Sequence, residues 1–179
     1  MGVLEQTKSR KIFLGADHDP LVRIIVINVL ITTILFFIRG VYQISRINIA
    51  DYQANVVDWL ILPAAFNKTI GKPWTLITYM FTHADIWKLI ANMLWLWAFG
   101  FIMQSMYGGR KLVPLYIYGG IAGSLFFVVT NLLLNGGSGN IPMYGANASV
   151  MAIATCITIA VPGYRIFPML NGGIPLWVL

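Results

Sequence analysis

Charge is what this chain has least of. Charged residues make up 10% of its 179 residues, hydrophobic residues make up 58%, and the mean hydropathy is +0.76. A soluble domain carries about a quarter charged residues. The composition therefore excludes an ordinary soluble domain and indicates a membrane protein.

Cysteine and histidine are also scarce. The single cysteine, Cys156, excludes an internal disulfide, and its apolar neighbours predict a packing role. With only two histidines beside it, the sequence offers no ligand set for a metal ion, so we expect neither a metal site nor a cofactor. The basic residues stand singly or in pairs near the ends of apolar runs, which favours membrane topology over nucleic-acid binding. Membrane lipid is the expected partner, and nucleic acid is not.

Four runs with little or no charge predict transmembrane helices at about residues 24–38, 89–107, 112–134 and 146–161. The second run would span roughly 28 Å at ~1.5 Å per residue, close to the hydrocarbon thickness. The first run is short, but arginines at both ends can snorkel, and no small-residue cleavage site marks it as a signal peptide. Residues 174–179 look like the start of a fifth helix. The predicted fold is an all-α, multi-pass membrane bundle.

Two segments outside these runs have a different character. Residues 1–20 are polar and predict an N-terminal tail, while residues 21–179 form one membrane domain. Within that domain, residues 39–88 are a long connection without charge runs or flexible linkers, which predicts a structured, interfacial loop. Its aromatic residues suit the membrane–water interface: Trp59, Trp74 and Tyr79.

The basic residues also predict the orientation. They flank the first run on its N-terminal side and fill the turn at 108–111, whereas residues 135–145 carry none. Cytoplasmic segments are enriched in Lys and Arg. We therefore expect a cytoplasmic N-terminus and an external loop at 135–145.

Polar residues gather where the second run begins. His83, Asp85, Lys88 and Asn92 precede or open it. Polar groups in such a place are costly unless they face protein or a wet cavity, so they form a functional-site hypothesis. The simpler alternative is capping of the helix at the membrane interface.

A second polar feature, YGANAS at 144–149, opens the fourth run. With the predicted orientation, both features lie on the outer side of the membrane and can meet in one cavity. The glycine turn at Gly145 would expose backbone N–H groups at the positive end of a helix dipole, which suits a nucleophile or an oxyanion. The simpler alternative is an ordinary glycine turn into a helix.

Several motifs stand at a specific spacing. They are PWTLITYMF at 73–81, His83 followed by Lys88 and Asn92, MLWLW at 93–97, Leu115-Tyr116 with Gly119 and Gly120, and GANASVMA at 145–152. With these motifs the chain resembles the rhomboid intramembrane serine proteases over roughly residues 20–179. The resemblance implies six helices around a water-filled cavity. It also implies a nucleophilic serine in a G-x-S motif on the fourth helix, a base histidine on the sixth, and a histidine and an asparagine on the second that hold the oxyanion.

The chain departs from that pattern at the positions that carry the chemistry. Asn147 falls on the position of the nucleophilic serine, and Lys88 falls on that of the oxyanion histidine. Asn92 and His83 match the family's residues, and Gln104 stands where the family has an acidic residue. The printed residues stop before a sixth helix, so the membrane domain is expected to be incomplete at its C-terminal end.

These departures predict a rhomboid homologue that is not a competent serine protease as written and that binds transmembrane segments. Whether it is a pseudoprotease or a fragment of an enzyme stays open. An active intramembrane endopeptidase would need an unconventional dyad of Ser149 and Lys88, yet Ser149 lies about 200° round the helix from Asn147 and points away from the cavity. A small transporter is a further alternative. The sequon formed by residues 147–149 is a poor glycosylation site at a helix start within the bilayer.

Overall fold

The structure is a computed structural model that describes residues 19–166 and 174–175. Its helices are α1 (Pro20–Ile44), α2 (Ile49–Asn55), η1 (Val57–Trp59), α3 (Phe66–Gly71), α4 (Thr75–Thr78), η2 (Tyr79–Phe81), α5 (Ile86–Tyr107), η3 (Gly109–Lys111), α6 (Leu112–Asn135) and α7 (Asn147–Ala160). Two short strands, β1 (Arg165–Ile166) and β2 (Ile174–Pro175), pair antiparallel. The α1, α5 and η3–α6 helices are long and apolar enough to cross a membrane, and α7 is a shorter apolar helix. The predicted all-α membrane fold is confirmed.

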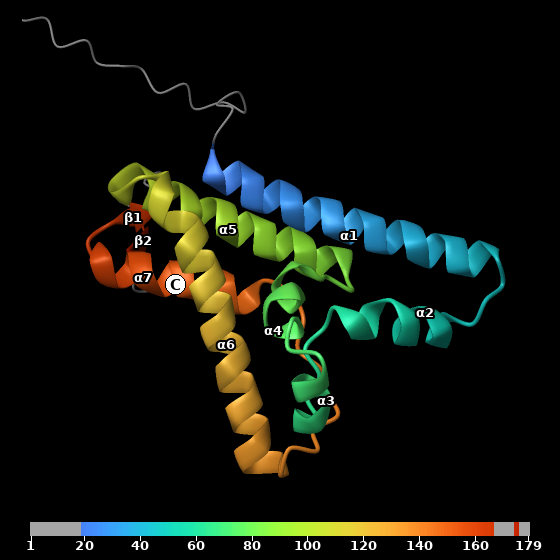
Figure 1. Ribbon diagram of the computed structural model, residues 1–179. Coiled ribbons are helices and arrows are strands. Elements are labelled where there is room, and N and C mark those ends of the chain that lie inside the picture. Colours follow the sequence, from blue (N-terminus) through green and yellow to red (C-terminus); the bar gives the residue numbers. More distant parts are fainter. Residues whose placement is uncertain (1–18, 167–173, 176–179) are drawn as a thin grey trace, which may run out of the picture.

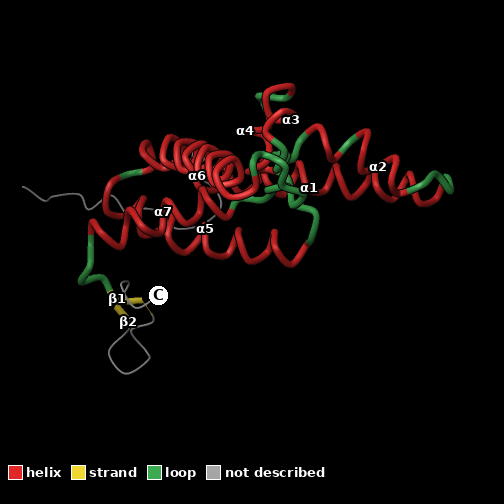
Figure 2. Tube along the Cα trace, turned by 90° about the horizontal axis from the view of Figure 1, so that it is seen from below, coloured by secondary structure: helices red, strands yellow, loops and turns green. Residues whose placement is uncertain are grey.

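Helix α7 packs against two of the long helices. It packs against α6 on one side and α5 on another, while α1 lies along the far side of α5 (Figure 1). The view turned by 90° keeps α5 and α7 side by side, with α6 crossing above them (Figure 2). The inward face of α7 is fully or nearly buried: Ser149, Val150, Ile153, Ala154 and Ile157. The remaining side chains of α7 are therefore the ones that can line an open surface beside α5.

The first helix is longer than the 24–38 run predicts. Asp19 caps it, since the carboxylate accepts a 2.9 Å hydrogen bond from the Leu21 N–H, and Pro20 fits the first helical position. At the other end the helix continues through Arg39 to Ile44. The uncharged run predicts that Arg23 and Arg39 bound the helix, but both are helical, because a long charged side chain can leave the apolar region without ending the helix.

The connection at 39–88 is structured, with three short α-helices and two 3-10 turns. Trp59 and Trp74 are half exposed and stack at 5.8 Å between ring centroids, as an interfacial position would allow. Tyr79 is different: it is fully buried and its hydroxyl donates a 2.7 Å hydrogen bond to the Gly120 carbonyl. The interfacial prediction is wrong for Tyr79, which is a core residue that ties the connection to α6.

Small residues let α6 and α7 approach closely. Gly119 and Gly123 stand at the spacing that predicts such packing. A Cβ atom added to Gly119 would collide with the Ala152 Cβ, and one added to Gly123 would collide with the Ala148 Cβ. The predicted packing role of both glycines is confirmed.

The predictions for Cys156 and for the two ends of the chain have other outcomes. Cys156 is exposed on α7, so the predicted packing role is wrong. At the C-terminal end, Ile174–Pro175 pair as a strand rather than start a helix, and the rest of the expected fifth helix, 176–179, lies outside the described residues. Nearly all of the expected tail at 1–20 lies outside them as well.

Candidate functional site

A glycine turn positions the start of α7. Gly145 has φ +93°, a conformation that L side chains rarely adopt, and its N–H donates a 2.9 Å hydrogen bond to the Tyr79 carbonyl. Two reciprocal hydrogen bonds of 3.0 and 2.9 Å between Leu62 and Met143 fix the loop just before it. The turn places Asn147, the first residue of α7, at one end of the groove between α5 and α7.

His83 connects this turn to α5. The side chain is 2% exposed, and its Nε2 lies 3.3 Å from Asn92 Nδ2 and 3.4 Å from the Ala146 N–H. Because the Ala146 backbone N–H can only donate, Nε2 is the acceptor and the ring proton is on Nδ1, which is buried without a hydrogen-bond partner among the described residues. Burial lowers the pKa of His83, and the Phe81 backbone opposes this more weakly, so the ring is neutral at pH 7.

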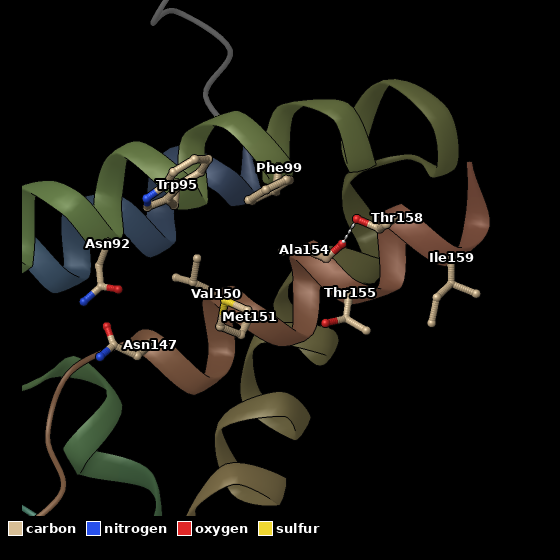
Figure 3. A pocket seen from close by; sticks show the side chains of 10 residues that line it. All are labelled: Asn92, Trp95, Phe99, Asn147, Val150, Met151, Ala154, Thr155, Thr158 and Ile159. Atoms are coloured by element: carbon tan, nitrogen blue, oxygen red, sulfur yellow. Dashed lines mark hydrogen bonds between the residues drawn. The ribbon is translucent and has the colours of Figure 1, made fainter. Parts of the chain in front are cut away.

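Two cavities share the polar residues of α5 and α7. The larger, of about 590 Å³, is a groove between the two helices, and in Figure 3 the side chains of Asn92 and Asn147 point toward one another at its end. Its lining is otherwise mostly apolar: Trp95, Phe99, Val150, Met151, Ala154, Thr155, Thr158 and Ile159. The smaller, of about 270 Å³, is lined by five sequence-predicted residues, which are His83, Lys88, Asn92, Gly145 and Asn147. Asp85 is not among them, because its carboxylate caps α5 by accepting a 2.9 Å hydrogen bond from the Trp87 N–H. The structure thus brings these five together at the polar end of an apolar groove.

Lys88 lies at the rim of the smaller cavity. Its Nζ is 3.4 Å from the Tyr144 hydroxyl and 5.0 Å from the centre of that ring. It is the only charged residue among those that line the two cavities in the described part of the chain. The rim therefore carries one positive charge beside two amide side chains.

Ser149 is not part of this constellation. It is fully buried, and its hydroxyl lies 3.7 Å from the Met80 sulfur, toward α6. Lys88 instead contacts Tyr144. The sequence-based expectation that Ser149 points away from the cavity is confirmed, and the described geometry forms no Ser149–Lys88 dyad.

Gln104 lies at the opposite end of α5. Its amide Nε2 donates a 2.6 Å hydrogen bond to the Asp19 carboxylate, the same group that caps α1. This hydrogen bond connects α5 to the start of α1, at the end of α5 away from the polar cavity.

Sequence reasoning missed the groove itself. Trp95 and Phe99 follow Asn92 at intervals of three and four residues on α5, and Met151 and Thr155 follow Asn147 at intervals of four residues on α7. Residues at such spacing share one helix face. That spacing could have predicted one lining face on each helix. The two faces form a groove when Asn92 and Asn147 lie opposite each other.

Comparison with known proteins gives the family of the chain. A family model described as the rhomboid domain matches residues 70–178, which is more than half of the chain. The chain belongs to the rhomboid family. The matched part of this rhomboid chain includes α4, α5, α6 and α7, and so contains both helices of the groove.

Rhomboid relatives occur in mitochondria, plants and bacteria. Rhomboid protein 1, mitochondrial, of Saccharomyces cerevisiae is 31% identical over 112 residues, which cover 58% of this chain and 30% of the yeast protein. RHOMBOID-like protein 12, mitochondrial, of Arabidopsis thaliana is 37% identical over 59 residues, 33% of this chain and 18% of that protein. Rhomboid protease GluP of Bacillus subtilis is 29% identical over 125 residues, 68% of this chain and 24% of that protein. The chain thus matches less than a third of the length of these relatives.

Proposed function

We propose that this rhomboid chain binds a transmembrane helix of another protein in the groove between α5 and α7 without hydrolysing it. The observation that carries the proposal is the place of Asn147. The resemblance assigns this position to the family's nucleophile, yet the side chain is an amide that faces Asn92 at the head of an open groove. An amide cannot form an acyl-enzyme, but it can hydrogen-bond a bound segment.

The shape and chemistry of the groove support a helix as the ligand. It follows α7 from Asn147 to Ile159, a rise of roughly 18 Å at ~1.5 Å per residue. Trp95 is 44% exposed and Met151 is 62% exposed along it, so apolar side chains are available for contact. Small residues such as Ala154 line the floor between them, and small residues are what lets a second helix approach within a membrane.

The location of Ser149 supports the non-hydrolytic form of the proposal. An active endopeptidase would need a hydroxyl at the cavity beside a group that can take its proton. Ser149 is buried toward Met80, and the Lys88 ammonium lies on Tyr144. We therefore favour binding over cleavage.

Filling the groove is expected to weaken binding. In liposomes, a dye-labelled transmembrane peptide rich in Leu and Ala should associate with the labelled chain, with energy transfer between the dyes as the measurement. Thr155 is exposed and lines the groove, so Thr155→Phe should raise the peptide Kd at least about tenfold by occupying the site.

The matched control is Thr33→Phe, since Thr33 is exposed on α1 and lines neither cavity. That variant should bind the peptide as the unchanged chain does. Equal Kd values for Thr155→Phe and the unchanged chain would contradict the proposed site.

We also propose that the N-terminus is cytoplasmic and that the loop at 135–145 is external, as the basic residues predict. Lys111 and Ser138 are exposed near opposite ends of α6. In a Cys156→Ser background, a membrane-impermeant maleimide should label Ser138→Cys in intact cells and label Lys111→Cys only after permeabilisation. The reverse pattern would invert the topology.

A further inference from the structure

A third cavity, of about 340 Å³, lies between α1 and the start of α5. Phe36 and Arg39 line it from α1, and residues 84–87 line it where α5 begins. The two helices pack on each other, with α1 beside α5 in Figure 1. In the described part of the chain, this cavity shares no lining residue with the groove or with the smaller polar cavity. A ligand bound here would therefore be separate from a helix bound in the groove.

This third cavity holds two opposite charges that do not pair with each other. Arg39 and Asp85 are both half-buried, and among the described residues no ion pair joins them. One Asp85 oxygen accepts the 2.9 Å hydrogen bond from the Trp87 N–H, and no other described residue hydrogen-bonds that carboxylate or the Arg39 guanidinium. Each charge is favoured by an opposite charge nearby. The cavity between them therefore suits a ligand that carries both an anion and a cation.

Apolar surface continues from the cavity along both helices. Ile86 lines the cavity, and Ile90 and Leu94 follow it at intervals of four residues on one face of α5, each about half exposed. On α1, Phe37 is 72% exposed next to the lining residue Phe36. Both helices are long and apolar enough to cross a membrane. A charged cavity above such surface matches the headgroup and acyl chains of a phospholipid.

We propose that this cavity binds a phospholipid whose headgroup has a primary ammonium group, of the phosphatidylethanolamine class. The phosphate pairs with the Arg39 guanidinium, which can donate two parallel hydrogen bonds to it, and the ammonium pairs with the second oxygen of Asp85. Trp87 lines the cavity and is 74% exposed, as suits a ring at the level of lipid headgroups. A choline headgroup has no N–H to donate to the carboxylate, and an anionic glycerol headgroup has no cation.

Native mass spectrometry of the full chain, released from detergent micelles, measures this selectivity. The chain is titrated with phosphatidylethanolamine, phosphatidylcholine and phosphatidylglycerol that have identical acyl chains, and the Kd of the first bound lipid is determined. The ethanolamine lipid is expected to bind about fivefold more tightly than the other two, the upper range for a partly exposed charge pair. Equal Kd values, or tightest binding of phosphatidylglycerol, would overturn the inference.

Asp85→Asn tests the contact with the ammonium. Asparagine caps a helix as well as aspartate does, so α5 should keep its first turn. The variant should bind the ethanolamine lipid no more tightly than the choline lipid. The matched control is Asp51→Asn, which removes the same charge from an exposed position on α2 that does not line the cavity, and it should keep the preference. A preference that survives Asp85→Asn would contradict the inference.

Arg39→Gln tests the contact with the phosphate. It should weaken all three lipids by about fivefold, whereas Arg46→Gln, at an exposed position outside the cavity, should leave them unchanged. Equal effects of the two substitutions would rule out the phosphate contact. Soluble phosphoethanolamine at the lipid's concentration should not displace the lipid, since it lacks the acyl chains that lie on α1 and α5. Displacement would show that the cavity binds a small soluble phosphate and not a membrane lipid.

Discussion

The 179-residue chain carrying Asn147→Ser is expected to remain without proteolytic activity. The substitution supplies a hydroxyl at the start of α7, but serine attack also needs a base to take the proton, and removing one member of such a triad typically costs ~10⁴ to 10⁶ in rate. His83 is the only histidine in the described residues, and its Nε2 already accepts from the Ala146 N–H and Asn92. Lys88, which lines the same cavity as Asn147, carries a positive charge and contacts the Tyr144 hydroxyl.

A proteoliposome assay with a fluorogenic transmembrane substrate measures this directly, with Asn147→Ala as the matched control and an active rhomboid protease as the positive control. The unchanged chain, Asn147→Ser and Asn147→Ala should all give background rates. Turnover by the unchanged chain that Ser149→Ala or Lys88→Ala abolishes would contradict the account and support the unconventional dyad.

The second large effect is expected when a side chain is added at Gly119, where α6 and α7 lie close together. Gly119→Leu should lower the free energy of unfolding by about 3 kcal/mol, because a side chain there collides with Ala152 and must push α7 away from α6. The same displacement moves Asn147 relative to Asn92, so peptide binding should fall together with stability. Unfolding in mixed micelles with increasing SDS measures the first effect, and energy transfer measures the second.

Gly40→Leu is the matched control. A Cβ at Gly40 on α1 meets no atom within 4 Å, and leucine is a better helix former than glycine. This variant should unfold at the same SDS fraction as the unchanged chain, or a higher one. Equal losses for the two glycine substitutions would show that the α6–α7 contact is not what stabilises the groove.

Composition and uncharged runs predicted the helices well, because hydrocarbon thickness sets the length of a spanning helix and charge marks its surroundings. The ends of α1 were missed, since Arg23 and Arg39 lie within the helix rather than beside it. Helix ends depend on caps and side-chain reach, and Asp19 supplies the cap here.

The connection at 39–88 could not be predicted in detail, because distant partners fix it. The Tyr79 hydroxyl bonds the Gly120 carbonyl, and the Leu62 backbone pairs with Met143. No local pattern encodes contacts between residues so far apart in the chain, and local rules placed Tyr79 at the interface. Tertiary packing made it a core residue.

The polar end of the site was predicted from motif spacing, but its partners were not. The spacing of His83, Lys88 and Asn92, with the turn at Gly145, indicated one shared cavity. The contact of Lys88 with Tyr144 depends on how the loop before α7 folds back over α5. Side-chain direction in a loop follows from such backbone detail, which periodicity does not describe.

Photo-crosslinking of a defined transmembrane peptide tests the central claim most directly. A benzophenone amino acid at Met151, which is 62% exposed in the groove, is compared with the same group at Phe126, which is 74% exposed on α6 and lines neither cavity. The mass of the captured peptide is then determined. The account predicts saturable cross-linking from position 151 only, with the peptide intact. Equal, non-saturating yields from both positions, or captured fragments of the peptide, would contradict it.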